Sequence, residues 1–396
     1  MGLGRGFRRL WAGNAFGNLG DGIVFVAIPL LASSLTTEAI LIAGLAAMYS
    51  GVRLLVVVPV GVFVDRLDRR TMLWITNAAR AALLLGMGAL FATGHGSLPL
   101  LYIVFAALGA LETAADNAAL SILPSVVPSR GLDQANSRIS AAQLVADEFV
   151  GPPLGGVLFA VAVALPALAA GGFYAAASIF FLALPRRSGG GTPLLPRRSA
   201  YREALDGAVW LRRHRLLGGL AVVGGLASVA YMMPFSVLVL YAHQTLGLDA
   251  AGYGVMLAVS ALGGLVGSFV TTPLRARLGY GGAIVGSLAL GAVSMLALAV
   301  TESVWVAAAL LAVYILHAVV WGICVSSLRQ RLVPDALRGR VNASSRVLGL
   351  VGLTFGALAG GLLATTWGLS APFVASGAVF LVCALVAHPL LRPRTE

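Results

Sequence analysis

Charged side chains occur inside long apolar stretches of the first half of the sequence, where they could transfer protons or hold a charged ligand. These residues are Asp21, Arg53, Arg80, Glu112, Asp116, Asp147 and Glu148. An ionised side chain at the centre of a bilayer costs about 2.5–3.5 kcal/mol on insertion scales, so each needs a partner or a function. A carboxyl group that alternates between wet and dry surroundings binds a proton in one and releases it in the other. The candidate carboxylates for proton coupling or substrate binding are Asp21, Glu112, Asp147 and Glu148.

One face of the first apolar stretch is polar and follows the i, i+4, i+7, i+11 spacing of a helix: Asn14, Asn18, Asp21 and Phe25. A polar face of this kind suits a water-filled cavity, so we expect these side chains to line one. The alternative is structural, with Asp21 paired to Arg53 so that the first two helices are fixed to each other. Arg53 and Arg80 are the available counter-ions, and a structural ion pair is the favoured interpretation for Arg80.

The other acidic residues form two close pairs. Glu112 and Asp116 are four residues apart, so they share a helix face and repel each other when both are ionised. Asp147 and Glu148 are adjacent, and successive helical residues point about 100° apart. We therefore expect only one of this second pair to face a cavity. This concentration of acid suits protons and a cationic cargo.

A motif of small residues follows the second acidic pair. It comprises Gly151, Pro152, Gly155 and Gly156. Proline removes a backbone donor and glycine removes side-chain bulk, so the motif predicts a helix kink and close approach of another helix. Ordinary tight packing and a hinge are both compatible with this pattern.

Several aromatic or ionisable side chains lie well inside other apolar stretches: Tyr49, Tyr231, Phe235, Tyr314, His317 and Trp321. All of these except Tyr314 are taken as candidates for lining a cavity. Any one of them could equally face lipid or fill a core. His317 and Trp321 are one helical turn apart and form the best candidate pair in the second half.

The composition requires a membrane protein. The 396 residues are 59% hydrophobic and 11% charged, whereas soluble domains carry about 25% charged residues. Apolar runs of about 20 residues, the length of a membrane span, predict twelve transmembrane helices and an all-α fold. The predicted spans are 8–34, 39–64, 72–94, 97–123, 133–161, 164–184, 215–241, 248–273, 281–300, 303–328, 338–365 and 369–391.

The arginines are distributed unevenly among the connections. They lie at the N-terminus, in the connections after every second span, and at Arg392 and Arg394, while the opposite connections have none. The positive-inside rule then places both termini in the cytoplasm, and it accounts for the net charge of +12 without a nucleic-acid partner. Since the chain contains no lysine, it has no P-loop. We expect no cofactor and no metal site, with an ion gradient as the energy source.

The chain divides around its longest polar segment. We expect an N-terminal half at 1–184, a cytoplasmic linker at 185–215 and a C-terminal half at 216–396. The second part of the linker has apolar residues at helical spacing opposite arginines, which predicts an amphipathic helix on the inner leaflet. Residues 126–141 and 332–347 align with each other, so the two halves of six helices are expected to be pseudo-symmetric.

Three motifs resemble those of the major facilitator superfamily. Gly61-x-x-x-Asp65-Arg66-x-x-Arg69-Arg70 is similar to the superfamily's loop signature, with Asp68 in place of a glycine. Residues 151–156, GPPLGG, are similar to the proton-antiporter signature G-P-x-x-G-G. Residues 16–22, 123–128 and 134–136 resemble the branch of bacterial drug, macrolide and siderophore exporters, although the fourth span lacks the arginine of many antiporters.

This resemblance implies a secondary active transporter, not an enzyme. It implies a proton-coupled exporter of an amphiphilic small molecule, such as a drug or siderophore, working by rocker-switch alternating access as a monomer in the bacterial inner membrane. An importer or a lipid flippase of the same fold is the nearest alternative, because the fold does not determine direction. A membrane receptor that transports nothing is less favoured, because it would not need carboxylates within the membrane.

The loop signature generates a first prediction. The resemblance implies that Asp65 meets the positive N-terminal end of the eleventh span, near Arg338 and Arg340, and latches the outward-open state. The Asp65→Asn substitution should therefore shift the protein toward its inward-open state, measured as a change in spin-label distances across the two ends. An unchanged distance distribution would contradict the latch.

Overall fold

The protein is built from helices. The computed structural model describes residues 3–64, 68–128, 131–185 and 200–391. Within these residues, eleven helices are long and apolar enough to cross a membrane. The chain is therefore a multi-pass membrane protein with an all-α fold, as its composition predicted. The location of its termini in the cytoplasm and the symmetry of its halves remain predictions.

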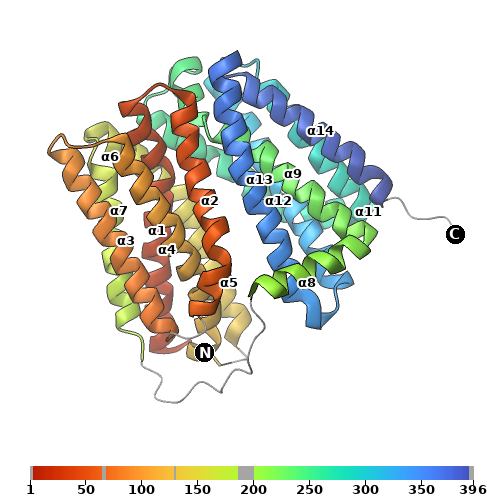
Figure 1. Ribbon diagram of the computed structural model, residues 1–396, viewed down its shortest axis with the longest axis horizontal. Helices are drawn as coiled ribbons and strands as arrows, with labels where there is room; N and C mark the ends of the chain where they lie inside the picture. Colours follow the sequence, from red (N-terminus) through yellow and green to blue (C-terminus); the bar gives the residue numbers. More distant parts are fainter. Residues whose placement is uncertain (1–2, 65–67, 129–130, 186–199, 392–396) are drawn as a thin grey trace. The chain divides into compact units, whose positions relative to one another are not determined.

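The helices follow one another along the chain (Figure 1). Their bounds are α1 Gly4–Leu35, α2 Ala39–Val64, α3 Arg69–Ala92, α4 Leu98–Val126, α5 Leu132–Gln143, η2 Leu144–Val150, α6 Gly151–Val161, α7 Leu165–Leu182, α8 Ala200–Arg213, α9 Arg215–Phe235, α10 Leu238–Leu240, η3 Tyr241–Thr245, α11 Ala250–Leu298, α12 Val304–Leu332, η4 Asp335–Leu337, α13 Arg338–Trp367 and α14 Ala371–Leu391.

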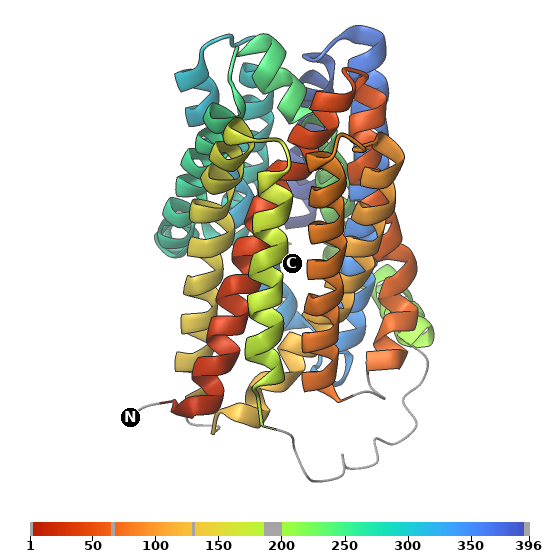
Figure 2. The same ribbon diagram turned by 90° about the vertical axis from the view of Figure 1, so that its left-hand side faces the viewer.

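The chain packs as two compact units, and neither is a single run of sequence. The first unit comprises Met1–Leu35, Leu55–Ala200 and Asp249–Ala258. Inside it, α7 lies between α1 and α3 (Figure 2). Glycines of α1 make this approach possible, because a Cβ on Gly13 would lie 2.6 Å from the ring of Phe181. The division predicted at residues 185–215 remains a prediction.

The second unit comprises Thr36–Leu54, Tyr201–Leu248 and Val259–Glu396. Here α13 packs along α9, and α14 lies on the other side of α9 (Figure 1). Gly352, Gly356 and Gly360 repeat every four residues on the face of α13 that meets α9. A Cβ on any of them would lie within 2.5 Å of a carbonyl oxygen of α9. Since no side chain fits there, these glycines bring the two backbones together, as in other small-residue membrane interfaces.

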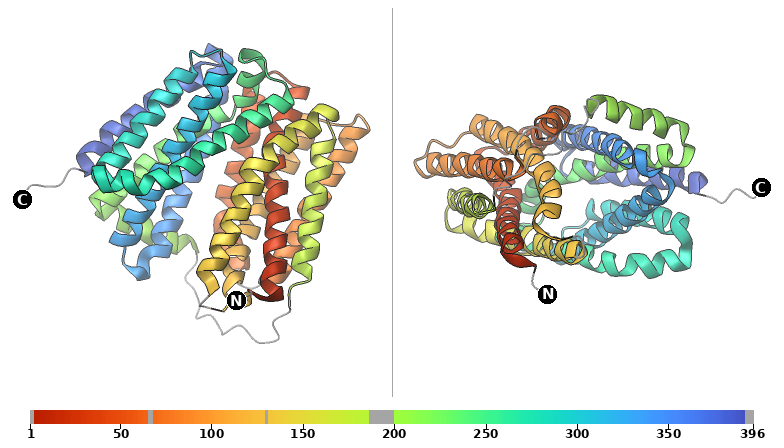
Figure 3. Two further views of the ribbon diagram at one scale, coloured as in Figure 1. Left: turned by 180° about the vertical axis from the view of Figure 1, so that it is seen from behind. Right: turned by 90° about the horizontal axis from the view of Figure 1, so that it is seen from below.

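The longest helix, α11, accounts for two of the predicted spans. Its backbone is helical on both sides of Gly279, which has φ 68° and ψ 178°. The two arms meet there at an angle (Figure 3). Because a positive φ costs glycine little and other residues much more, Gly279 is the residue that allows the turn. The eleven apolar helices therefore correspond to the twelve spans that the sequence predicted.

The fifth span changes its winding where it carries its acidic residues. Residues Leu144–Val150 form a π-helical turn between α5 and α6, and this turn ends at Gly151, directly before Pro152. Such turns inside α-helices frequently occur at functional sites. The sequence predicted a kink in this region, and its form is a π-helical turn followed by a proline.

The predicted amphipathic helix is present as α8, Ala200–Arg213. It packs on the first turn of α13, where Arg340 and Asp206 form an ion pair of 3.3 Å and Gly207 touches the backbone of Arg340. Leu211 is buried, whereas Leu205 and Val209 are exposed. The exposed pair is one turn apart, which suits contact with lipid. The position of α8 on the inner leaflet remains a prediction.

Some charges of the connections have local partners. Arg70 donates to the carbonyl of Leu182, and Arg9 donates to the carbonyl of Ala183, so two arginines bind the C-terminal end of α7. Cations at this end oppose the negative end of the helix dipole. Asp68 is the N-cap of α3 and accepts hydrogen bonds from the backbone N–H and the hydroxyl of Thr71 at 3.1 and 3.0 Å. Helix capping therefore accounts for Asp68 at a position where the family signature has glycine.

The glycine contacts of α13 can be tested by stability. Gly356→Ala places a Cβ 2.5 Å from the carbonyl oxygen of Val229, and overpacking of this kind costs about 1–3 kcal/mol. Thermal unfolding in detergent should show a clear loss of stability. Gly286→Ala is the matched control, since its Cβ meets no atom within 4 Å and alanine favours a helix. Equal melting temperatures for the two variants would contradict the packing argument.

Candidate functional site

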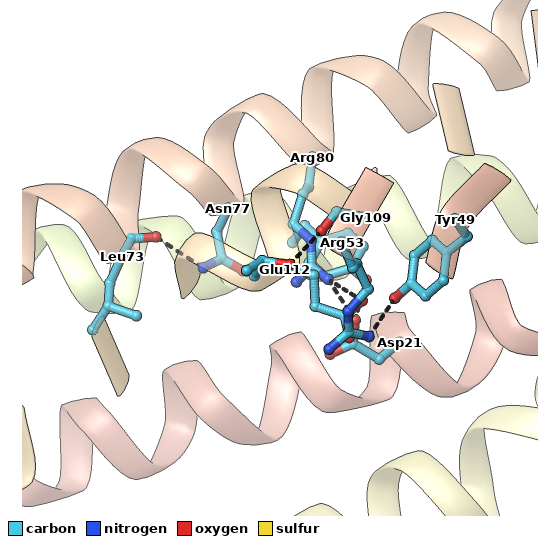
Figure 4. Close-up of polar contacts among 10 residues, drawn as sticks. Asp21, Tyr49, Arg53, Leu73, Asn77, Arg80, Gly109 and Glu112 are labelled. Carbon is cyan, nitrogen blue, oxygen red and sulfur yellow. Dashed lines mark hydrogen bonds and ion pairs between the residues drawn. The ribbon is translucent and has the colours of Figure 1, made fainter. Parts of the chain in front are cut away.

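The first unit contains an ion-paired cluster of side chains from three helices, centred on a buried arginine (Figure 4). Arg80 of α3 donates to Asp21 of α1 at 2.9 Å and to Glu112 of α4 at 3.2 Å. The Arg80 side chain is 5% exposed, while those of Asp21 and Glu112 are 28% and 22% exposed. One guanidinium therefore holds two carboxylates that retain access to the surrounding space. Arg80 was predicted as a counter-ion, and the structure identifies its partners.

Tyr174 of α7 completes the surroundings of Asp21. Its hydroxyl donates to the same Asp21 oxygen at 2.6 Å, and the Arg80 guanidinium lies 4.5 Å from the centre of its ring. A cation over a tyrosine face is attracted by the ring quadrupole. The sequence analysis missed Tyr174, because a single tyrosine in an apolar helix has no pattern that distinguishes it from a packing residue.

The glycines of α1 determine which way Asp21 points. Gly17 and Gly20 are buried against α3 and α7, with a Cβ on Gly20 only 3.1 Å from the Tyr174 ring. The predicted polar face lies beside this glycine face. Asn14, Asn18 and Asp21 are half-buried, and Phe25 is 49% exposed. Asp21 therefore sits at the border between the helix contacts and the more open side of α1.

Asp21 has partners that the structural alternative did not include. That alternative paired it with Arg53 of α2, whereas Arg80 of α3 and Tyr174 of α7 both bind its carboxylate. Arg53 belongs to the second unit, where its guanidinium donates to the hydroxyl of Tyr49 at 3.3 Å. Two cavity candidates of α2 thus contact each other within one helix.

The adjacent acids of the fifth span differ in burial. Asp147 is half-buried and Glu148 is exposed. The backbone of Asp147 touches α1, because a Cβ on Gly22 would lie 2.5 Å from the Asp147 carbonyl oxygen. Gly22 directly follows Asp21, so this contact brings the π-helical turn of the fifth span beside the ion-paired cluster. The two adjacent side chains thus differ in burial, and the expectation that only one of them faces a cavity stays a prediction.

The small-residue motif holds this turn in place. Gly151 packs on Gly22, and Gly155 packs on the backbone of Ile23, so two turns of α6 follow α1. Gly156 faces the other way, where its Cβ would lie 2.3 Å from the carbonyl oxygen of Ala250. Gly151, Pro152, Gly155 and Gly156 are all buried. Tight packing of α6 against two neighbours therefore accounts for these positions.

The second unit gathers its aromatic candidates into one cluster. Tyr231 stacks on Phe235 with ring centres 4.4 Å apart, and the ring centres of Tyr314 and His317 are 4.5 Å apart. His317 is 2% exposed, and its Nδ1 contacts the backbone carbonyl of Tyr314. Trp321, one turn further along α12, lines two cavities of this unit. Tyr314, which the sequence analysis named among the aromatic residues of the spans, is a central member of this cluster.

The residues of the loop signature are only partly described. Asp65 and Arg66 lie outside the described residues, as do the surroundings of Gly61. Arg69 is exposed, and Arg70 binds the end of α7. In the other unit, Arg338 pairs with Asp335 at 2.8 Å and Arg340 with Asp206 at 3.3 Å. The latch involving Asp65 therefore stays a prediction.

The cluster is suited to charge exchange. In the part of the chain that the structure describes, no group of three or more His, Cys, Asp or Glu side chains could hold a metal ion. The cluster instead joins two carboxylates, one guanidinium and one phenol. A proton or a cation that binds the Asp21 carboxylate would compete with the Arg80 guanidinium.

Known sequences resemble this chain over most of its length. Residues 10–348 match the family model described as Major Facilitator Superfamily. An uncharacterized MFS-type transporter of Mycobacterium tuberculosis is 28% identical over 367 residues, which cover 85% of this chain and 79% of that protein. The enterobactin exporter EntS of Citrobacter koseri is 28% identical over 374 residues, which cover 90% and 85%.

Comparison with solved structures shows the same fold. A mutant of the nucleoside transporter NupG superposes with a TM-score of 0.81 at 11% identity, over 98% of this chain and 100% of that one. A bacterial homologue of the iron transporter ferroportin in an inward-facing state gives 0.78 at 19% identity, over 98% and 99%. At these identities the likeness concerns the fold alone.

The ion-paired cluster predicts an asymmetry between two substitutions. Arg80→Gln removes the cation that two mutually repelling carboxylates share, and loss of one partner from a buried pair costs about 3–5 kcal/mol. Asp21→Asn should cost less, because Arg80 keeps Glu112. Thermal unfolding in detergent at neutral pH should rank the variants in this order.

Acidification provides the control for this comparison. At low pH the carboxylates of the Arg80→Gln variant take up protons and no longer need a cation. The difference in melting temperature between this variant and Asp21→Asn should therefore shrink. A larger loss of stability in Asp21→Asn at neutral pH would contradict the shared-cation arrangement.

Proposed function

Because the chain belongs to the major facilitator superfamily, we propose that it is a secondary active transporter that exports an amphiphilic small molecule in exchange for protons. We place it in the bacterial inner membrane as a monomer, surrounded by lipid and working by rocker-switch alternating access. The observation that carries the proposal is the position of Asp21, which shares the buried Arg80 with Glu112.

The proposed coupling uses the competition at Asp21. When Asp21 is ionised, Arg80 and Tyr174 both bind its Oδ1. A proton on Asp21 weakens its attraction to Arg80, so α1 and α3 are held together less tightly. Export in exchange for protons requires the cargo to leave the cell while a proton enters it. Asp21 must release its proton within each cycle, and it then pairs with Arg80 again. Asp147 and Glu148, in the turn beside Gly22, are further candidate proton carriers.

Export as the direction has a separate basis. The relatives named enterobactin exporter cover 90% of this chain, and the sequence motifs resemble the exporter branch. Inward proton flow through the carboxylate cluster could drive the cargo outward, which agrees with export.

Proteoliposomes provide the direct test. Purified protein is reconstituted with a pH-sensitive dye inside, a pH gradient is imposed, and enterobactin or ethidium is supplied as a trial cargo. Cargo movement should follow the gradient and should be accompanied by proton flux. Transport that is indifferent to the gradient would contradict proton coupling.

Substitution of Asp21 tests the assigned residue. Asp21→Asn keeps the shape of the side chain but removes the ionisable group, so gradient-driven transport should be lost while folding is retained. Asp133→Asn, an exposed acid at the start of α5, is the matched control and should transport normally. Normal coupled transport by Asp21→Asn would exclude Asp21 as the proton carrier and would leave Glu112, Asp147 and Glu148 to be tested.

A further inference from the structure

The second unit contains a cavity that the ion-paired cluster does not use. Its volume is about 460 Å³, and it is lined by residues of α8, α9, α12 and α13. Every described residue that lines it belongs to the second unit. Its volume falls within the range of about 300–1,000 Å³ that is usual for small-molecule sites.

The polar lining of this cavity is positively charged. Arg329 of α12 and Arg346 of α13 both line it, and the described lining contains no aspartate or glutamate. Ser326, Asn342 and Ser345 add uncharged hydrogen-bonding groups on the same two helices. Both arginines are partly buried. The first unit has the opposite character, with two carboxylates around one guanidinium.

An aromatic compartment adjoins the charged cavity. A second cavity of about 160 Å³ shares Gly224, Ser228 and Trp321 with the first, and it is lined further by Tyr231, Tyr314 and Phe380. Gly224 lies beside Trp321, since a Cβ on Gly224 would make van der Waals contact with the Trp321 ring at 3.9 Å. A ligand can therefore place one end at the arginines and its other end among the aromatic rings.

We infer that these joined cavities bind an aromatic organic anion, with its carboxylate, sulfonate or similar group at Arg329 and Arg346 and its ring system beside Trp321 and Tyr231. The inference rests on the proposed transport function and names the class of its cargo. It replaces the cationic cargo that the acidic residues suggested, because Asp21 and Glu112 are paired with Arg80 and the described lining of this cavity contains no acid.

The chemistry of the lining favours this class. A guanidinium presents a planar set of donors that matches the oxygens of a carboxylate or sulfonate. A cation in the same place would be repelled by the two guanidinium groups, and a neutral molecule would lack the ionic attraction that an anion gains from them. The rings of Tyr231, Trp321 and Phe380 offer offset or edge contacts to an aromatic body.

A matched pair of ligands tests the charge requirement. Naphthalene-2-sulfonate and the uncharged naphthalene-2-sulfonamide have the same ring system, so they differ chiefly in charge. Calorimetric titration of the full chain in an uncharged detergent, corrected against empty micelles, should give at least tenfold tighter binding for the sulfonate. This factor corresponds to the added strength of hydrogen bonds between ionised groups. Equal affinities would overturn the inference.

Variants assign the two ends of the ligand. Arg329→Gln and Arg346→Gln should each weaken sulfonate binding about tenfold with little effect on the sulfonamide, while Arg346→Lys should retain only part of the affinity, because an ammonium keeps the charge without the planar donor set. Trp321→Ala should weaken both ligands alike. Arg277→Gln, an exposed arginine of α11 that does not line the cavity, is the matched control and should bind as the unaltered chain does. Unchanged sulfonate binding in correctly folded Arg329→Gln and Arg346→Gln would also overturn the inference.

An anionic lipid is the other possible source of such a head group. Dioleoylphosphatidylglycerol is titrated in place of the sulfonate, and binding of this lipid with no binding of the sulfonate would overturn the assignment to an aromatic solute. These titrations are made at equilibrium without a pH gradient, so their failure leaves the gradient-driven transport test unaffected. Conversely, sulfonate binding without proton-driven transport would retain the site and reject the proposed coupling.

Discussion

The burial of Arg80 is the constraint on which the first unit depends. A guanidinium that is 5% exposed among apolar helices must have anionic partners, and it finds them on α1 and α4. These contacts, together with Tyr174 of α7, join four helices through a single side chain. Since the same oxygen of Asp21 accepts both Arg80 and Tyr174, the state of one carboxylate influences the contacts of several helices. Under the proposed function, the structural ion pair and the proton site are the same feature.

Close packing of backbones makes this arrangement possible. Gly22 and Gly151 bring the fifth span onto α1 directly beside Asp21, and Gly352 and Gly356 bring α13 onto α9 in the other unit. Membrane helices gain no hydrophobic free energy by associating with each other in lipid, so such contacts depend on close fit. The π-helical turn at Asp147 lies at the end of one of these contacts. Acidic groups are thus placed where the backbone is both tightly held and unusually wound.

The two units divide the charge between them. The first contains carboxylates arranged around one guanidinium, and the second contains a cavity with two arginines and an aromatic wall. A transporter that exchanges protons for an organic anion needs both kinds of site, because a proton carrier must be acidic and an anion site must be basic.

The sequence by itself determined the all-helical membrane fold and the superfamily, because apolar length and the loop signature are local properties of the chain. It also identified Asp21, Arg80 and Glu112 as side chains that required partners, since an intramembrane charge is costly whatever surrounds it. Only the tertiary structure decided which of them meet. It placed Tyr174 beside Asp21 and located Arg53 in the other unit, and it brought Arg329 and Arg346 from separate helices into one cavity. Helical spacing reveals the face on which a residue lies, but the neighbour opposite that face depends on how the helices pack.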